Sequence, residues 1–360
     1  MKGFYPPPFQ QILLWLKNEL FGSATQSSKP RLAGPDLIRI AAAVFVILIH
    51  VSCQGFYSFS DYWKICTKFD SAARMAVPLF FMLSGYFLFT DKPPMPLSAF
   101  LKRRFSRILI PLVLTFVIYF IVRNWSVSDW LHRVFTGGVN FHLWFMYTLV
   151  GIYLAVPLFQ PLFTTEQGRK LALYYVFLWL LAAVLFAYAR RYYGWSINPF
   201  GQFNFHYFFG FMGFLFVGGL LRRIELSARW RWISFGVCIL ATILIYRFTK
   251  SWSLSLGKPN ELFFENLSPF VVLQAVSFFL ALKDIKFQSA KLAFVAEHTY
   301  WIYLVHMLAM GVLQRYSGLT VHNHTALNIV LITAGTFAFS FALSIPLFYF
   351  EKKIHHWLQL

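Results

Sequence analysis

The chain has 360 residues, of which 58% are hydrophobic and only 12% are charged. Soluble domains carry about 25% charged residues, so this chain has too few charges to cover a water-exposed surface. Its 44 Phe, 18 Tyr and 12 Trp likewise exclude a disordered protein. The composition predicts a polytopic membrane protein.

A strongly basic balance accompanies this composition. The 32 Lys and Arg against 13 Asp and Glu give a formal net charge of +19. In a soluble protein this excess would suggest nucleic-acid binding. In a membrane protein it is expected in cytoplasmic loops and against anionic lipid headgroups. We therefore expect membrane lipids, and no nucleic acid, as partners.

The N-terminal segment is expected to lie on the membrane surface. No small-residue cleavage site follows its short apolar stretch, so it is not typical of a cleaved signal peptide. Apolar residues share one face of a predicted interfacial helix, namely Phe9, Ile12, Leu13, Leu16 and Leu20. We predict that residues 1–35 form this cytoplasmic amphipathic helix and a linker, and that residues 36–360 form a transmembrane domain.

About ten segments are apolar over the roughly 20 residues that a helix needs to cross a bilayer. They lie near residues 37–54, 75–90, 107–122, 141–160, 171–189, 204–221, 231–247, 268–282, 294–313 and 326–350. No strand-like alternation persists, so we predict an all-α, polytopic transmembrane helical bundle. With the N-terminus inside, basic residues are about twice as frequent in inner as in outer segments, which predicts that both termini are cytoplasmic.

The first span carries three ionisable residues: Asp36, Arg39 and His50. Eleven positions separate Arg39 from His50, so the two share one helical face about 16 Å apart along the axis. Asp36 can pair with Arg39 from one turn before it. Arg39 can hold a phosphate, and a neutral imidazole can take a proton from a hydroxyl. Alternatively, Arg39 snorkels to the interface and His50 is a hydrogen-bonded packing residue; this helix alone leaves both interpretations open.

The second and fourth spans add polar residues at their predicted outer ends. Arg74 opens the second span, and Pro78 is expected to kink it. His142 stands beside Trp144 at the start of the fourth span. An interfacial aromatic belt explains Trp144, but it explains the adjacent histidine less well.

The ninth span contains His298 and His306. They are eight positions apart and differ by roughly 80° around the helix, so they need not serve one site. The histidines and the three cysteines show no tight ligand pair with an acidic third residue, and we predict no metal site.

Together these residues resemble the acyltransferase family 3 of integral-membrane O-acyltransferases. The matching pieces are Asp36-x-x-Arg39, Arg39-x10-His50, Arg74-x3-Pro78-x5-Ser84-Gly85, Arg103-Arg104-x2-Arg107-x3-Pro111, His142-x-Trp144-Phe145 and Tyr303-x2-His306. They follow the family's order and span residues 36–306. Within the family, the stretches at residues 77–82 and 142–145 resemble the short, ten-helix O-acetyltransferases, such as the one that modifies enterobacterial common antigen.

The resemblance implies a bacterial inner-membrane enzyme for polysaccharide modification. Its donor would be acyl-CoA, usually acetyl-CoA, on the cytoplasmic side, and its acceptor a hydroxyl of a cell-surface or lipid-linked sugar. It also implies His50 and Arg39 as the functional pair, with no permanently bound cofactor. We expect the donor phosphates at Arg39, Arg103, Arg104 and Arg107. We expect the acceptor at Asp36, Arg74, His142, Trp144 and His306.

A transporter of a polysaccharide precursor or small molecule is the competing hypothesis. Ten helices with buried Arg and His residues suit transport as well. Transporters often contain an internal repeat, and neither a second Arg-x10-His pattern nor a duplicated hydropathy half occurs here. This difference favours the enzyme.

Overall fold

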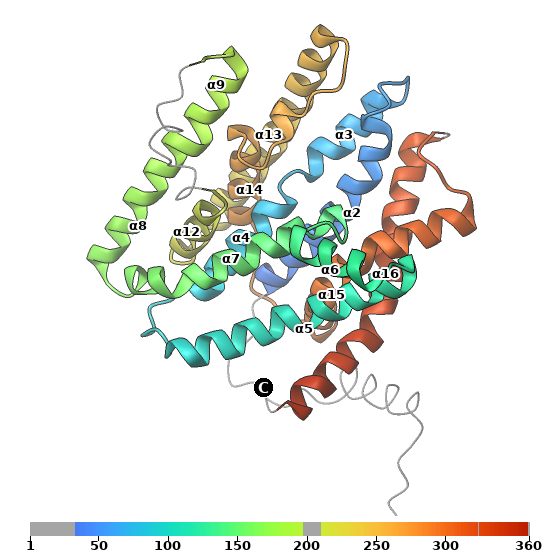
Figure 1. The fold of residues 1–360 in the computed structure, drawn as a ribbon. Helices are drawn as coiled ribbons and strands as arrows, with labels where there is room; N and C mark the ends of the chain where they lie inside the picture. The colour runs from blue at the N-terminus through green and yellow to red at the C-terminus, as the bar shows by residue number, and fades with distance from the viewer. Residues whose placement is uncertain (1–32, 197–209, 323, 359–360) are drawn as a thin grey trace, which may run out of the picture.

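The computed structural model describes residues 33–196, 210–322 and 324–358. Every regular element in these ranges is helical, which confirms the predicted all-α class (Figure 1). The first half contains α2 (Ala33–Phe56), α3 (Trp63–Ala73), α4 (Ala76–Leu88), α5 (Leu97–Arg123), α6 (Val127–Thr136), η1 (Phe141–Leu143), α7 (Trp144–Phe159), η2 (Gln160–Phe163), α8 (Glu166–Trp179), the π-helical η3 (Leu180–Phe186) and α9 (Ala187–Tyr193). The second half contains α12 (Met212–Leu221), α13 (Ala228–Leu256), η4 (Leu262–Phe264), α14 (Pro269–Leu282), α15 (Ala290–Ser317) and α16 (Thr325–Trp357).

Eight helices or helix groups in the described ranges are long and apolar enough to cross a membrane. They cover Ala33–Phe56, Trp63–Leu88, Leu97–Arg123, Phe141–Phe163, Glu166–Tyr193, Ala228–Leu256, Leu262–Leu282 and Thr325–Trp357. The two other predicted spans correspond to the short apolar α12 and to α15. The predicted amphipathic helix at residues 9–20 and the start of the span near residue 204 lie outside the described residues. The span number and the cytoplasmic termini stay predictions.

The second span begins earlier than predicted and is broken in its middle. It starts at Trp63 instead of near residue 75, because the charged residues of α3 hid its helical first half from a hydropathy pattern. Pro78 lacks the N–H that would bond to the carbonyl of Arg74, four residues before it. The helix is accordingly interrupted at Arg74 and Met75, between α3 and α4. Arg74 therefore lies at an internal break and not at the outer end of the span.

Two other elements differ from the sequence prediction. The third span begins at Leu97 instead of near residue 107, so Arg103, Arg104 and Arg107 lie on α5 itself. This helix runs across the neighbouring long helices (Figure 1). The short α6 was not predicted; none of its residues is buried, and the Ser126 hydroxyl caps it by accepting from the Asp129 backbone N–H at 3.1 Å.

Two glycines let α4 and α12 approach each other at backbone distance. A Cβ atom on Gly85 would stand 1.9 Å from the Leu215 carbonyl oxygen, and one on Gly218 would stand 1.9 Å from the Met82 carbonyl oxygen. Any larger residue at either position would push the helices apart, as at small-residue contacts in other membrane proteins. This contact fixes the α4 half of the broken span in the bundle.

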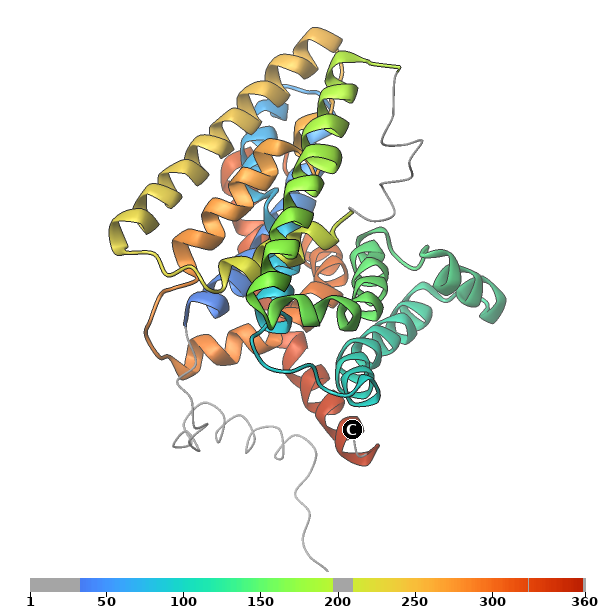
Figure 2. The same ribbon diagram turned by 90° about the vertical axis from the view of Figure 1, so that its left-hand side faces the viewer.

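Helices α2 and α15 form the centre around which the site is built. The α2 helix packs against α3, α4, α14, α15 and α16, and α15 packs against α2, α5 and α16. In both views α2 lies within the bundle; α8 and α13 lie to its left in Figure 1, and α8 runs in front of the bundle in Figure 2. The Tyr300 hydroxyl donates to the Ile108 carbonyl at 2.8 Å and ties α15 to α5. The pairing of α2 with α15 brings residues 256 positions apart in sequence, such as Gln54 and Met310, into one site.

Candidate active site

Each of the two functional residues predicted on α2 opens into a cavity of its own. Arg39 lines a cavity of about 890 Å³, here called the basic pocket. His50 lines a second cavity of about 650 Å³, here called the histidine cavity. Both volumes lie in the range of small-molecule binding sites. The shared helix places the two residues about 16 Å apart along its axis.

The basic pocket gathers positive charge from three parts of the chain. It is lined by Arg39, Ala99, Lys102, Arg103, Ser106, Arg107, Glu297, Phe348, Glu351, Lys352 and His355. The α5 residues among them fall at spacings of one, three and four positions, which form one face of a helix. Arg39, Arg103 and Arg107 therefore meet, as the sequence predicted for donor binding. Arg104 points away from that face and does not line the pocket.

Asp36 is placed as the neighbour of Arg39 and lines neither cavity. Its carboxylate lies 3.7 Å from the Arg39 guanidinium, in the predicted pairing one turn apart. Arg39 also stands over the Phe87 ring at 5.5 Å from the centroid. These two contacts orient the guanidinium while leaving it at the pocket wall.

Three histidines from distant parts of the chain contact one another beside the histidine cavity: the rings of His50 and His306 are stacked, and the His142 ring meets both edge-on. The ring of His50 on α2 lies 5.2 Å from that of His306 on α15 and 6.4 Å from that of His142 on η1. The His142 and His306 rings are 4.9 Å apart. We call these three residues the histidine cluster. His142 is only 2% exposed, because η1 turns it into the bundle; its place at the outer membrane interface stays a prediction.

Tyr303 sets the orientation of this cluster. The Nδ1 atom of His306 lies 2.5 Å from the Tyr303 carbonyl, and because a carbonyl only accepts, Nδ1 must carry the proton. In the neutral ring this leaves Nε2 with a lone pair, and Nε2 has no hydrogen-bond partner among the described residues. The Tyr303 hydroxyl donates to the His142 carbonyl and joins α15 to η1. His298 packs instead among Phe294, Phe341 and Phe348, apart from the cluster, as its angular offset predicted.

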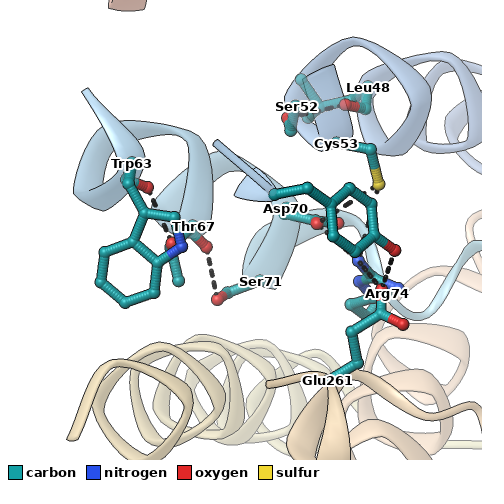
Figure 3. Close-up of polar contacts among 10 residues, drawn as sticks. Leu48, Ser52, Cys53, Trp63, Thr67, Asp70, Ser71, Arg74 and Glu261 are labelled. Atoms are coloured by element: carbon teal, nitrogen blue, oxygen red, sulfur yellow. Dashed lines mark hydrogen bonds and ion pairs between the residues drawn. The ribbon is translucent and has the colours of Figure 1, made fainter. Parts of the chain in front are cut away.

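Arg74 reaches the histidine cavity from the break between α3 and α4. Its guanidinium lies 2.5 Å from the buried Asp70 carboxylate and 3.9 Å from Glu261 (Figure 3). It also stands over the Phe264 ring at 4.1 Å from the centroid. A buried cation needs such paired and hydrogen-bonded surroundings, because an isolated one is costly in a membrane.

Polar and aromatic residues surround the rest of the histidine cavity. Trp144 is among its lining residues, and its predicted role in acceptor binding stays a prediction. Sequence reasoning missed four polar lining residues, namely Gln54, Tyr57, Glu261 and Asn266. No motif contained them, and Glu261 and Asn266 stand on the connection between α13 and α14. The sequence also did not predict five polar residues that line the basic pocket, namely Lys102, Glu297, Glu351, Lys352 and His355. Of these, Lys102 directly precedes the predicted Arg103, so its position in the sequence could have indicated it.

No group of three or more His, Cys, Asp or Glu side chains is arranged to hold a metal ion in the part of the chain that the structure describes. His50 and His142 line the histidine cavity, whereas His306, predicted as an acceptor-binding residue, is fully buried and does not line it. The cluster is best considered as a set of proton-accepting groups beside the cavity.

Comparison with known proteins identifies the family of this fold. A family model described as an acyltransferase domain, Acyl_transf_3, matches residues 32–345. No curated protein and no solved structure matches the chain. The match covers the histidine cavity and every motif residue discussed above, and it covers the basic pocket except for the lining residues beyond position 345, namely Phe348, Glu351, Lys352 and His355. The chain therefore belongs to the Acyl_transf_3 family of acyltransferase domains, and it is a membrane acyltransferase.

Proposed function

We propose that the protein moves an acetyl group from acetyl-CoA to a hydroxyl of a cell-surface or lipid-linked carbohydrate in the bacterial inner membrane. The observation that carries this proposal is that Arg39 and His50 share one helix and open into separate cavities. One cavity is rich in cations, and the other holds imidazole rings. A donor that carries phosphates at one end and a thioester at the other suits this division.

The basic pocket is suited to the phosphates of the donor. Five cationic side chains line it against two carboxylates. Arginine guanidinium groups form forked, charge-assisted hydrogen bonds to phosphate oxygens, and they stay charged when partly buried. The charge bias of the sequence predicts that this end of α2 faces the cytoplasm, where acyl-CoA is found.

The histidine cavity is suited to the acceptor. In the proposed reaction His50 removes the proton of the acceptor hydroxyl while its oxygen attacks the thioester carbonyl. The carbon–sulfur bond breaks, and the leaving thiolate takes a proton to give free CoA. His306, stacked on His50 with a free Nε2, supplies a second site for the proton. Arg74, His142 and Trp144 line the space in which the sugar would be held.

Acetyl-CoA turnover by the purified protein in liposomes tests this function. Release of free CoA thiol is measured with candidate lipid-linked sugars, for the wild type beside His50→Ala and Arg39→Ala. Turnover by the wild type and its loss in both variants, with membrane insertion unchanged, is the expected result. Wild-type turnover by His50→Ala would contradict the assignment. Failure of the wild type to bind CoA would favour a transporter.

A further inference from the structure

Glu261 occupies an unusual position for a charged residue of a membrane protein. It follows α13, which ends at Leu256 and is capped by Gly257 with a φ of 63°. Hydrogen bonds hold the short connection that carries it. The Asn260 N–H donates to the Ser253 hydroxyl at 3.0 Å, and the Leu262 N–H donates to the Asn260 side chain at 2.9 Å. Phe264, which lies under Arg74, is 1% exposed and anchors the same connection. This connection presents Glu261 to the histidine cavity.

Two groups hold the Glu261 carboxylate in place. The Tyr57 hydroxyl donates to it at 2.5 Å, and the Arg74 guanidinium lies 3.9 Å away. Burial, together with this hydrogen bond to the carboxylate, raises the pKa of the Tyr57 phenol, which keeps it a donor. One oxygen of Glu261 is therefore engaged, and its side chain is still 44% exposed.

The charge of Arg74 is already matched by another carboxylate. Asp70 is fully buried and contacts Arg74 at 2.5 Å, whereas Glu261 is exposed and more distant. Figure 3 shows the guanidinium between the two carboxylates. One cation against two carboxylates leaves an excess negative charge, and it resides on the exposed carboxylate of Glu261. The wall of the histidine cavity therefore carries a negatively charged group that can accept hydrogen bonds but cannot donate them.

We propose that Glu261 selects the acceptor: it accepts hydrogen bonds from an uncharged, hydroxyl-rich unit and excludes units that carry a carboxylate or phosphate beside the reacting hydroxyl. The inference rests on the proposed acyl transfer to a carbohydrate and narrows its substrate class. Trp144 offers an aromatic face in the same cavity, and Asn266 offers an amide. An anionic sugar placed there would approach the Glu261 carboxylate and be repelled by its like charge.

The test compares two matched ligands without any turnover. The full chain in lipid nanodiscs is titrated with p-nitrophenyl β-D-glucoside and with p-nitrophenyl β-D-glucuronide, and binding is followed by saturation-transfer NMR. The two differ by one carboxylate. The wild type should bind the glucoside about tenfold more tightly, which corresponds to ~1.4 kcal/mol. Glu261→Gln should remove most of this preference, chiefly by tighter binding of the glucuronide.

The chain offers a matched control four residues away. Glu265 lies on the same connection, pairs with Arg191 and does not line the cavity. Glu265→Gln makes the same chemical change and should keep the wild-type preference. Glu261→Gln keeps the shape of the side chain and an oxygen to which Tyr57 can donate, so it should fold. An unchanged preference in Glu261→Gln, or no binding of either glycoside by the wild type, overturns the proposal.

The outcome is separable from that of the proposed function. If the ligand preference depends on Glu261 but the protein never consumes acetyl-CoA, the proposed acyl transfer is contradicted and the proposed selection by the cavity stands. Consumption of acetyl-CoA with the same preference in wild type and Glu261→Gln would keep the enzyme and remove only the selection.

Discussion

The basic pocket and the histidine cavity are built from the same helix but on different principles. The basic pocket gathers the half-buried Arg39 from α2 and exposed cations from α5 and α16, so its character is net charge. The histidine cavity draws side chains from α2, the α3–α4 break, η1, α7, the α13–α14 connection and α15, and its two charged lining residues are Arg74, which pairs with Asp70, and Glu261. The comparison teaches that one end of the site is suited to attract a charged ligand, and the other to orient a reaction.

Replacement of His50 should have the largest effect and should separate the two regions. His50→Ala removes the proposed base, and loss of general base catalysis lowers turnover by about 10²–10⁴-fold. The affinity for CoA should stay unchanged, because His50 lies outside the basic pocket. Turnover of acetyl-CoA and equilibrium binding of CoA are measured on the same preparation. Weakened CoA binding with normal turnover would reverse the roles of the two cavities.

Removal of an arginine of the basic pocket should weaken the binding of the CoA donor and not the chemical step. A charge-assisted hydrogen bond contributes about 1.5–3 kcal/mol, so Arg103→Ala should raise the Kd for CoA roughly tenfold to a hundredfold. The neighbouring Arg104 provides the control, since it lies on α5 outside the pocket. Arg104→Ala should leave CoA affinity within about twofold of the wild type. Equal losses in both variants would mean that general surface charge, and not the pocket, holds CoA.

The role of His306 is tested by a replacement that separates its two ring nitrogens. His306→Asn keeps a donor for the Tyr303 carbonyl but lacks the basic Nε2. If Nε2 receives the proton, turnover should fall by about ten- to a hundredfold in His306→Asn, as in His306→Ala. Near-normal turnover by His306→Asn beside an inactive His306→Ala would assign His306 a packing role only. The dependence of turnover on pH is recorded for each variant.

Ionic strength should give the smallest contrast between the two regions. The exposed charges of the basic pocket are screened by salt, with a Debye length of about 10 Å at 0.1 M and about 3 Å at 1 M. CoA binding should weaken severalfold over this interval. Binding of an uncharged glycoside in the histidine cavity should change little. Equal salt dependence of the two ligands, measured by titration in nanodiscs, would argue against this division.

Local features of the sequence were enough to predict much of this protein. Hydropathy identified the helical class, because a span needs an apolar segment that is contiguous in sequence. It failed at α3 and at the start of α5, where Lys64, Lys68, Asp70 and the arginines of α5 interrupt the apolar pattern although the chain stays helical. The shared face of Arg39 and His50 was predictable for the same local reason, since it depends only on the helical period.

The sequence by itself determined the membrane class, the helices and the residues that mark the family. Only the tertiary structure decided that the rings of His142 and His306 contact His50, that Arg39 meets the arginines of α5 in one pocket, and that Glu261 stands near Arg74. The physical reason is that these contacts join helices far apart in the chain. Their geometry follows from how whole helices pack, and glycines such as Gly85 and Gly218 set the distance between two of these helices. The spacing of residues along the sequence does not predict such packing.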